Sequence, residues 1–420
     1  MDGQVYRISH NLSTNLLVLI IMRTLYISAL SSRRLVDNIY NKTKENPGFA
    51  VQKFSRLLVH GLYANDTDVC TLSNPPIPSN IDKCSWVGYK DEIEDGIRYK
   101  YVPFLNIPLV KHICLFLYSF FYVLFWGFQE KKQKVIICDV LTVSLCMGAL
   151  LASKLNRVQS VAVVTDIYGM MVGNTSFLGN QAAKMNNNYV SRFDKYVLLT
   201  EQMNNLVNPR KKPYIVMEGL CDASIGDTSI TRSKNYPRTV LYAGGIHEKY
   251  GLKMLAEGFV AANVKDAKLV LYGSGPYVEE YMKLCQRYPN LEYGGVVTNE
   301  KIVEQEYRAT LLVNPRFTTE AFTKYSFPSK NMEYMVSGTP LLTTKLPGMP
   351  KEYYPYVFLF EEETVEGYAT AISKALSMTD EALKEFGERA RWFVLHEKNN
   401  IVQGGRVVEM LKYTAESKRA

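Results

Sequence analysis

Two side chains of the C-terminal half, Lys330 and Glu333, have types and spacing suited to holding a phosphate and a sugar hydroxyl. They fall in a predicted helix, residues 329–337, that begins after Pro328 and stops at Gly338. The first turn of a helix offers unpaired N–H groups and a positive dipole end, which attract phosphate. Lys330 adds a cation there, and Glu333, one turn further, can accept both hydroxyls of a ribose. This predicts a nucleotide-sugar site; the alternative is a solvated helix with an (i, i+3) ion pair.

Three glycine clusters of the same half each follow a predicted strand, at the end where ligands of parallel sheets bind. They are Gly244 and Gly245, with Lys249 in the same loop; Gly273 and Gly275; and Gly295 with Val296. Glycine lets the backbone approach a diphosphate or a flat base closely, although each cluster alone is ordinary turn chemistry. We expect these glycines to lie at the same edge of the sheet as Lys330 and Glu333, which favours a single ligand bound by all of them.

The composition is that of a globular protein with more than one domain. The 420 residues are 47% hydrophobic and 21% charged, and this length predicts two or three domains. The formal charge of +8 favours an anionic partner or a membrane surface. No nucleic-acid-binding motif accompanies it, so we expect no nucleic-acid partner. The seven scattered cysteines form no C-x-x-C pair, which predicts reduced thiols in a cytoplasmic protein.

Two apolar segments bear on membranes. Residues 16–22 are too few to cross a bilayer, and we interpret residues 1–22 as an N-terminal extension, with Met22 as an alternative start. Residues 113–128 are uncharged and rich in aromatics, with lysines on both sides. A helix of this length would be roughly 24 Å long, short of a ~30 Å hydrocarbon core. It fits either a helix buried in its domain or one lying in the membrane interface, and the net positive charge of the chain favours the interface.

Apolar strands alternate with helices along the chain. We predict strands at 23–30, 68–73, 96–103, 134–139, 158–166, 195–200, 214–218, 238–243, 267–272, 290–293, 310–314 and 339–344. We predict helices at 50–60, 113–128, 142–156, 252–262, 278–287, 299–308 and 329–337 and three more after residue 363, and a polar loop up to residue 46. Uniformly apolar strands separated by helices indicate parallel sheets covered on both faces.

The order of these elements predicts an α/β protein of two doubly wound, Rossmann-like domains that face each other across a cleft. The N-terminal domain would span 23–222 and the C-terminal domain 238–395. The polar, aperiodic residues 223–237 would link them. A last helix, within 396–420, would pack back on the N-terminal domain.

The motifs of the C-terminal half resemble those of a known family. They are Gly244-Gly245 with Lys249, Tyr272-Gly273-Ser274-Gly275-Pro276, Gly294-Gly295-Val296, and Pro328-Ser329-Lys330 followed by Glu333-Tyr334-Met335 and Gly338-Thr339-Pro340. Over about 238–345 they look like the donor half of glycosyltransferase family 4, with the GT-B fold. They are most similar to members that make bacterial capsule or exopolysaccharide.

The resemblance implies retaining transfer from a nucleotide-diphosphate sugar, with no bound metal and no tightly bound cofactor. It implies that Gly245 and Lys249 contact the diphosphate, that Ser329 and Lys330 lie over the phosphates, and that Glu333 binds the ribose. The histidines show no metal-ligand spacing either.

The sequence departs from the family pattern at one position. Many members carry a first glutamate eight residues before the second, near the donor sugar, and here that position is Tyr325. Either this role is absent, or Glu320 reaches in from a longer loop. Arg316, in the same loop, could form a planar fork on phosphate oxygens or pair with Glu320.

The N-terminal half offers fewer candidates. Gly48 opens a predicted helix where the family often carries a glycine-rich loop that faces the donor phosphates. Asp139 and Asp166 each end a predicted strand, and Asp166 falls where the family often has a polar residue contacting the reacting sugars. Both aspartates could instead cap the helices that follow them.

These observations predict a glycosyltransferase (EC 2.4) that moves a sugar from a nucleotide sugar to a lipid-linked or polysaccharide acceptor at the cytoplasmic face of the plasma membrane. The catalytic candidates are Asp166, Lys249, Glu320 and Lys330. One alternative is a sugar-nucleotide epimerase of the same fold, which needs neither membrane nor acceptor. Another is a non-catalytic partner protein, which Tyr325 favours. The first strand lacks the G-x-G-x-x-G of a Rossmann dehydrogenase.

Overall fold

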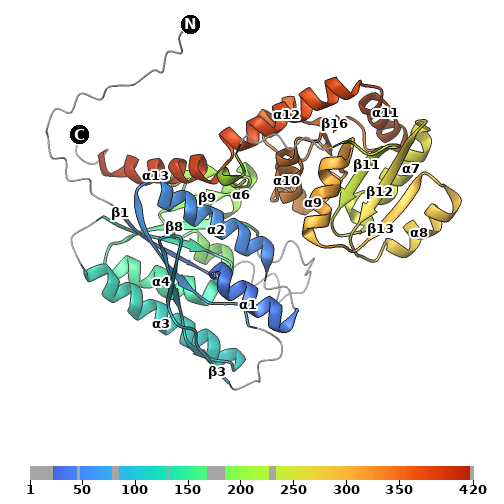
Figure 1. Ribbon diagram of the computed structural model, residues 1–420. Coiled ribbons are helices and arrows are strands. Elements are labelled where there is room, and N and C mark those ends of the chain that lie inside the picture. Colours follow the sequence, from blue (N-terminus) through green and yellow to red (C-terminus); the bar gives the residue numbers. More distant parts are fainter. Residues whose placement is uncertain are drawn as a thin grey trace, which may run out of the picture.

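The computed structural model consists of two α/β halves that lie side by side (Figure 1). It describes residues 22–44, 48–77, 85–129, 133–167, 185–226 and 233–416. The predicted extension 1–22 therefore lies outside the described residues except for Met22, as do parts of the predicted linker and of the C-terminal end.

The N-terminal half is built on one large sheet. Its strands are β1 Met22–Ser28, β2 Thr67–Ser73, β4 Glu92–Glu94, β5 Ile97–Tyr101, β7 Lys134–Asp139, β8 Gln159–Val164, β9 Lys195–Leu198 and β10 Tyr214–Val216. Within the described residues their order is β10-β9-β8-β7-β1-β2-β5-β4. Neighbours pair in parallel except β4 and β5, which form an antiparallel hairpin at one edge. β3 Trp86–Val87 and β6 Phe104–Leu105 form a separate antiparallel pair.

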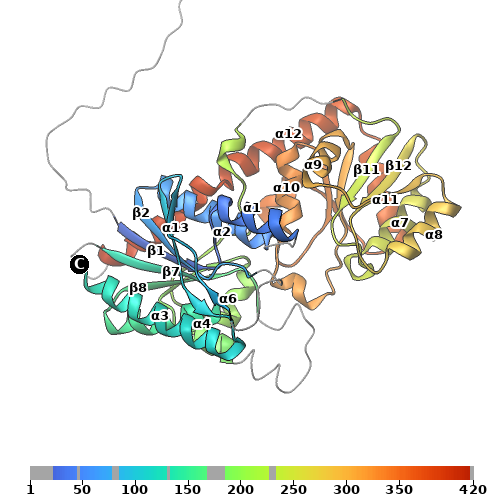
Figure 2. The same ribbon diagram turned by 60° about the horizontal axis from the view of Figure 1, so that its bottom comes forward.

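Alternate residues of these strands pack against helices on opposite faces of the sheet. In β1, Leu25 and Ile27 belong to the core under one set of helices, and Tyr26 belongs to the core under the other. The first set is α3 Pro108–Phe128, α4 Val143–Leu155 and α6 Glu201–Val207, and the second includes α2 Phe49–Ala64 and α13 Asn400–Glu416. Figure 2 shows α3 and α4 together below the sheet and α2 above it.

The C-terminal half repeats this plan with a fully parallel sheet. Its strands are β11 Arg238–Ala243, β12 Ala267–Tyr272, β13 Leu291–Gly295, β14 Leu311–Asn314, β15 Leu341–Thr344 and β16 Phe358–Phe360, in the order β13-β12-β11-β14-β15-β16. One face is covered by α7 Leu252–Ala262, α8 Val278–Arg287 and α11 Val365–Leu376, and the other by α9 Asn299–Arg308, α10 Ser329–Ser337 and α12 Asp380–Glu397. Two sheets with helices on both faces confirm the predicted α/β fold class.

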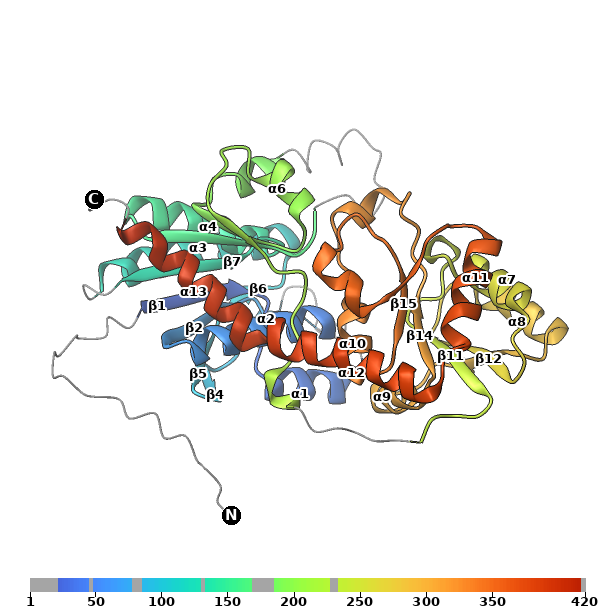
Figure 3. The same cartoon turned by 90° about the horizontal axis from the view of Figure 1, so that it is seen from above.

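The last two helices cross from one half to the other. Figure 3 shows α12 on the C-terminal half leading into α13 on the N-terminal half. α13 packs closely on α2 through glycines, because a Cβ added to Gly61 would lie only 1.9 Å from the carbonyl oxygen of Asn400. The chain passes between the halves after Cys221 and again before Asn400. The Asn400 N–H donates to the Cys221 carbonyl (2.9 Å), so these two connecting segments are hydrogen-bonded to each other.

One predicted loop is a helix. Residues expected to be a polar loop form α1 Arg33–Thr43, so this prediction was wrong. The helix is capped by Ser32, whose Oγ accepts the Leu35 N–H, and by Glu94, whose carboxylate accepts the N–H groups of Arg33 and Arg34. Glu94 lies some sixty residues further on, so this cap leaves no local sequence signal. The aromatic helix was also placed too short, since α3 begins at Pro108 and has 21 residues.

Candidate functional site

Helix α10 is fixed to the carboxyl ends of two strands by buried polar groups. The Tyr334 hydroxyl accepts the N–H of Ala243, the last residue of β11 (2.9 Å), and donates to its carbonyl (3.2 Å). The Asn331 side-chain oxygen accepts from Asn314, the last residue of β14 (2.6 Å). The helix ends at Gly338, in the left-handed region with φ 72°. Its first turn is therefore held at the edge of the sheet where α/β proteins bind ligands.

Four charged side chains meet at this turn and join the two halves of the molecule. Glu333 Oε2 lies 2.9 Å from Lys330 Nζ, and Glu333 Oε1 lies 3.2 Å from Nζ of Lys53, a residue of α2 in the N-terminal half. Lys330 Nζ also lies 3.9 Å from Oε1 of Glu306 on α9. We call Lys53, Glu306, Lys330 and Glu333 the α10 cluster.

The two carboxylates of the α10 cluster differ in their protonation. Burial alone would raise the pKa of Glu333, but the ammonium groups of Lys330 and Lys53 outweigh it and lower the pKa. Burial raises the pKa of Glu306 to about 7, against the opposing effect of Lys330. Glu306 is 3% exposed, and its Oε1 has no hydrogen-bond partner within the part of the chain that the structure describes. Glu333 is thus an ionised acceptor, whereas Glu306 is a buried acid that titrates near neutral pH.

Two further cations converge on one tyrosine ring. Lys249, in the short helix η2 Glu248–Tyr250, places its Nζ 5.7 Å from the centre of the Tyr250 ring, and the Arg316 guanidinium lies 5.0 Å from the same centre. Among the described residues, Arg316 forms no ion pair with Glu320. The two loops are held together at Gly251, where an added Cβ would lie 1.9 Å from the Pro315 carbonyl oxygen. Lys249 and Arg316 therefore form one positively charged surface.

The predicted glycines fall into two groups. Gly273 and Gly275 sit against backbone, because an added Cβ would lie 1.9 Å from the carbonyl oxygen of Gly244 and 2.2 Å from that of Ile246. They allow the β11 and β12 loops to pack together. Gly245 belongs to the same packed loops, and its carbonyl accepts the Tyr242 hydroxyl (2.9 Å).

The other two glycines have no described atom close to the position that a Cβ would take. Gly48, with φ 82°, precedes the first turn of α2, the helix that carries Lys53, and a Cβ added to it would have no atom within 4 Å. Gly295, with φ 77°, is equally open, and the next residue, Val296, is 71% exposed. These positions leave room for a ligand beside the backbone.

In the part of the chain that the structure describes, Asp139, Asp166 and Glu320 form no hydrogen bond or ion pair with the α10 cluster. The Asp166 carboxylate accepts the N–H of Ile167 (2.7 Å), and burial raises its pKa. Asp139 accepts the N–H of Leu141 (3.2 Å), and burial raises its pKa to about 6. Each aspartate thus holds the chain that follows its strand. Glu320 precedes the short helix η3 Ala321–Lys324 and is half-buried.

Tyr325, at the position where members of the resembled family carry a first glutamate, lies between the halves. Tyr325 packs against the core of the N-terminal half. Beside it, the Thr200 hydroxyl of that half donates to the carbonyl of Lys324 (3.0 Å). Tyr325 therefore serves packing between the two halves. Ser329, four residues further along the chain, is exposed at the start of α10.

Sequence reasoning missed two members of the α10 cluster, Lys53 and Glu306. The placement of Gly48 near the donor phosphates could have drawn attention to Lys53, one turn into the same helix. Glu306 lies in an amphipathic helix full of charge, and nothing in its neighbourhood distinguishes it. Within the described ranges, no group of three or more His, Cys, Asp or Glu is placed to hold a metal ion.

The sequence and the structure of this chain resemble those of known proteins. Residues 237–378 match the family model described as "Glycosyl transferases group 1", a stretch that runs from β11 through α11. No curated protein matches the sequence.

Solved structures match nearly the whole chain. The Anabaena protein Alr3699/HepE in complex with UDP is 13% identical, with a TM-score of 0.60, and the match covers 93% of this chain and all of that one. The lipopolysaccharide outer core galactosyltransferase WaaB is 12% identical with a TM-score of 0.60 over 94% of this chain and 100% of its own. Sucrose-phosphate synthase from Thermosynechococcus elongatus is 13% identical with a TM-score of 0.58 over 93% and 100%. The fold is GT-B.

The GT-B fold and the family match together support a glycosyltransferase, an enzyme of class EC 2.4. The matched family region contains α10, Lys249 and Arg316, and Lys53 is contributed by the other half of the GT-B fold. Membership of family 4 in particular remains a prediction.

Proposed function

We propose that this protein is a retaining glycosyltransferase that moves a sugar from a nucleotide-diphosphate donor to a lipid-linked or polysaccharide acceptor at the cytoplasmic surface of a membrane. The observation that carries the proposal is the ionised Glu333, one turn into α10, held by Lys330 and by Lys53 from the opposite half. The acceptor-side role of Asp166 is part of the same proposal.

Donor binding would use the α10 cluster in two ways. Glu333 is one-third exposed, and its carboxylate can accept both hydroxyls of a ribose. Those hydrogen bonds involve a charged acceptor and are stronger than neutral ones. Lys330, released from part of its pairing with Glu333, can turn toward the diphosphate. A donor seated here would contact both halves, since Lys53 belongs to α2.

Transfer of the sugar requires stabilisation of the nucleoside diphosphate that leaves. The N–H groups at the start of α10, Lys330, Lys249 and Arg316 would supply positive potential as negative charge develops on the phosphate. Retention would follow if the acceptor hydroxyl attacks on the face from which the phosphate leaves. The new glycosidic bond forms as the bond from sugar to phosphate breaks, and a phosphate oxygen takes the hydroxyl proton.

The choice of base to test first comes from a structural neighbour. The Anabaena HepE structure contains UDP, and UDP-sugars are therefore the first donors we would assign to this chain. The half-buried Gly295 and the exposed Val296 offer the rim on which a flat base could rest.

A large apolar face supports contact with a membrane. Within the described residues α3 alone is long and apolar enough to cross a bilayer, by length and composition, at roughly 31 Å. It is not wholly enclosed, because one side packs on α4 while the other exposes Leu109, Ile113, Leu117, Phe121, Phe125 and Phe128. α4 continues the surface with exposed Met147, Leu151 and Leu155. Neither helix contains an acidic residue.

The packing of α3 favours a helix that lies in the interface over one that spans the bilayer. Leu115, Val123 and Trp126 of α3 are buried in the same core as the central strands, and Gly148 of α4 lies against the backbone of Phe116. One side of α3 is thus buried in the domain core, and the other side is free to enter the headgroup region of a membrane. An apolar surface of this extent on a soluble domain commonly marks such a contact. The lysines expected at 131 and 132 lie outside the described residues.

The donor site is tested by thermal shift with UDP-, GDP- and dTDP-sugars. A donor at a hundred times its dissociation constant should stabilise the protein by about 2.7 kcal/mol. We expect the shift with one nucleotide class, and its loss in Glu333→Ala. Glu385→Ala, which removes an exposed carboxylate of α12, is the matched control and should keep the shift.

The outcomes separate the possible functions. A shift that survives Glu333→Ala would place the nucleotide elsewhere. No shift with any nucleotide sugar, from a folded protein, would favour a non-catalytic partner, which the tyrosine at position 325 also suits. A donor that is converted without any acceptor would indicate an epimerase.

A further inference from the structure

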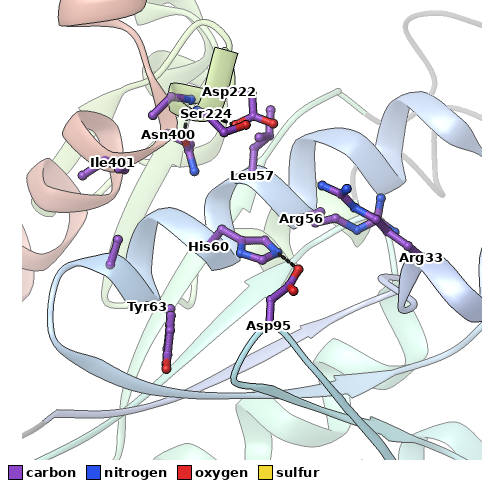
Figure 4. A pocket seen from close by; sticks show the side chains of 12 residues that line it. Arg33, Arg56, Leu57, His60, Tyr63, Asp95, Asp222, Ser224, Asn400 and Ile401 are labelled. Carbon is purple, nitrogen blue, oxygen red and sulfur yellow. Dashed lines mark hydrogen bonds and ion pairs between the residues drawn. The ribbon is translucent and has the colours of Figure 1, made fainter. Parts of the chain in front are cut away.

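A pocket lies beside α2, at the place where the chain crosses between the halves (Figure 4). Its volume is about 360 Å³, within the range of sites for small molecules. Its walls come from α1, α2, the β4–β5 turn, the short helix η1 Ala223–Ile225 with Asp222 before it, and the start of α13. No residue that lines it belongs to the α10 cluster, so it is a separate site.

Three basic side chains face this pocket. They are Arg33, Arg56 and His60, and Figure 4 shows them on adjoining turns of α1 and α2. Arg56 donates to the Ser31 carbonyl (2.9 Å) through one terminal nitrogen. Its Nε, and Nε2 of His60, are buried without a hydrogen-bond partner among the described residues. Polar atoms that are buried and unsatisfied are costly, and a shift of either side chain toward an acceptor in the pocket would remove that cost.

The two acidic residues of the pocket do not satisfy these donors. Asp95 Oδ2 lies 3.8 Å from His60 Nε2, which is too far for a hydrogen bond. Asp222 turns back on its own chain, where Oδ1 accepts the Ser224 N–H (2.9 Å). The Arg33 guanidinium forms no ion pair with any residue in the described ranges. Within the described residues, neither guanidinium forms an ion pair with Asp95 or Asp222, although these two carboxylates equal the two guanidinium groups of the cavity in number.

We propose that this pocket binds a small organic anion, a phosphate or carboxylate carried on a body about the size of one sugar. The anion would take hydrogen bonds from Arg33, Arg56 and His60. The body would rest on the apolar wall formed by Leu57, Tyr63 and Ile401. Planar guanidinium groups suit both phosphate and carboxylate oxygens.

The position of the pocket gives such a ligand contact with both connections between the halves. The Ala223 N–H donates to the Asn400 side chain (2.9 Å), which joins η1 to α13 at the rim. α2, which carries Arg56 and His60, also carries Lys53, one turn before Arg56. A bound anion would therefore stiffen the junction on which the two halves meet.

The pocket also predicts how binding depends on pH. Burial lowers the pKa of His60, and the nearby Arg33 and Arg56 lower it further, while Asp95 and Asp222 oppose them. His60 is therefore neutral at pH 7 without a ligand, and an anion favours its protonated form. Affinity for an anion of fixed charge should rise as the pH falls from 7.5 to 6.

Calorimetric titration of the full chain tests the proposal, with sulfate, inorganic phosphate, glucose 6-phosphate, glucose and citrate as probes. We expect at least one anion to bind, and Arg33→Gln to weaken it about tenfold. Arg34→Gln is the matched control, because Arg34 is the next residue, is exposed and pairs with Glu92 outside the pocket. Lys330→Gln should leave this binding unchanged, which distinguishes the pocket from the donor site.

Each result bears on the proposal. Tighter binding of glucose 6-phosphate than of inorganic phosphate, with none of glucose, would support an anion on a sugar-sized body, and citrate tests the carboxylate. His60→Gln should abolish the pH dependence of sulfate binding, because sulfate keeps its charge over this range. The proposal fails if no anion binds the folded protein, if Arg34→Gln weakens binding as much as Arg33→Gln, or if only Lys330→Gln weakens it.

Discussion

The α10 cluster and the α3–α4 face are both surfaces proposed to meet a substrate, yet they are built in opposite ways. In the α10 cluster, the helix that carries Lys330 and Glu333 is placed by buried hydrogen bonds, such as those from Tyr334 to the Ala243 carbonyl and from Asn314 to Asn331. α3 is also held by side-chain hydrogen bonds, such as those from Asn156 to the Val123 carbonyl (3.0 Å) and from Lys134 to the Trp126 carbonyl (2.8 Å), but the α3–α4 face itself does not depend on the position of single polar atoms. It is a repeated row of exposed apolar side chains on two helices whose other sides are buried.

This difference predicts different responses to substitution. A site that depends on the position of single atoms loses function when one atom is removed. A face that depends on apolar area loses function in proportion to the area removed, and tolerates exchange of one apolar residue for another. Three predictions follow that contrast, from the largest effect to the smallest.

Removing two aromatic side chains from α3 should have the largest effect on binding. Phe121 and Phe125 are 50% and 65% exposed, so Phe121→Ser with Phe125→Ser removes apolar surface without opening the core. Burial of a Phe side chain is worth about 1.5–3 kcal/mol, and the pair should lower partition onto anionic lipid vesicles about a hundredfold. Sedimentation with vesicles of phosphatidylglycerol and phosphatidylcholine measures this.

Two controls sharpen the vesicle experiment. Exchange of the same residues for leucine should keep most of the binding, as expected of a face defined by area. Trp392→Ser on α12, also 53% exposed, should have no effect. Equal losses in all three variants, or no vesicle binding by the unaltered protein, would remove the membrane from the proposed function.

The same contrast explains how much of the fold the sequence could predict. Helix α7 was predicted with its observed bounds, because apolar periodicity and the flanking Gly251 and Asn263 are local signals. Helix α1 was missed because it buries little and is capped by Glu94 from a distant hairpin. α6 and β16 were not predicted; each is short and obtains its stability from its neighbours.

The candidate site also contains residues with a local sequence signal and residues that only tertiary structure brings together. Lys330 and Glu333 lie three residues apart on one helix, so their pairing could be predicted from spacing. Lys53 and Glu306 reach the cluster through tertiary structure, from residues far away in the chain, and spacing cannot reveal that. Gly273 and Gly275 show the reverse case, since they matched a motif but their nearest neighbours are backbone atoms of the adjoining loop.

The buried acid of the α10 cluster should make stability depend on pH. Because burial raises the pKa of Glu306 from 4.5 to about 7, its contribution is fully favourable below pH 4.5 and is lost as the pH rises through 7. Glu306→Gln should therefore stabilise the protein at pH 8 by up to about 3 kcal/mol, and by much less at pH 5. Urea unfolding at both pH values measures the difference.

The control for this experiment is Glu385→Gln, which changes an exposed carboxylate by the same atoms. Its effect on the free energy of unfolding should be small and nearly equal at pH 5 and pH 8. If Glu306→Gln behaves in the same way, Glu306 is ionised in the folded protein at both pH values, and Lys330 compensates its burial.

The smallest predicted effect belongs to the hydroxyl that holds α10 in place. Tyr334→Phe keeps the ring but leaves the N–H and carbonyl of the buried Ala243 without this partner, which should cost about 1–2 kcal/mol of stability. Tyr236→Phe, at a 78% exposed position, should cost almost nothing. Because the lost contact positions Glu333 and does not touch the donor, KM for the donor should rise while Glu333 still binds. A variant that is as stable as Tyr236→Phe and keeps its donor KM would show that the strand end does not fix the helix, and that α10, like the α3–α4 face, is held by apolar packing.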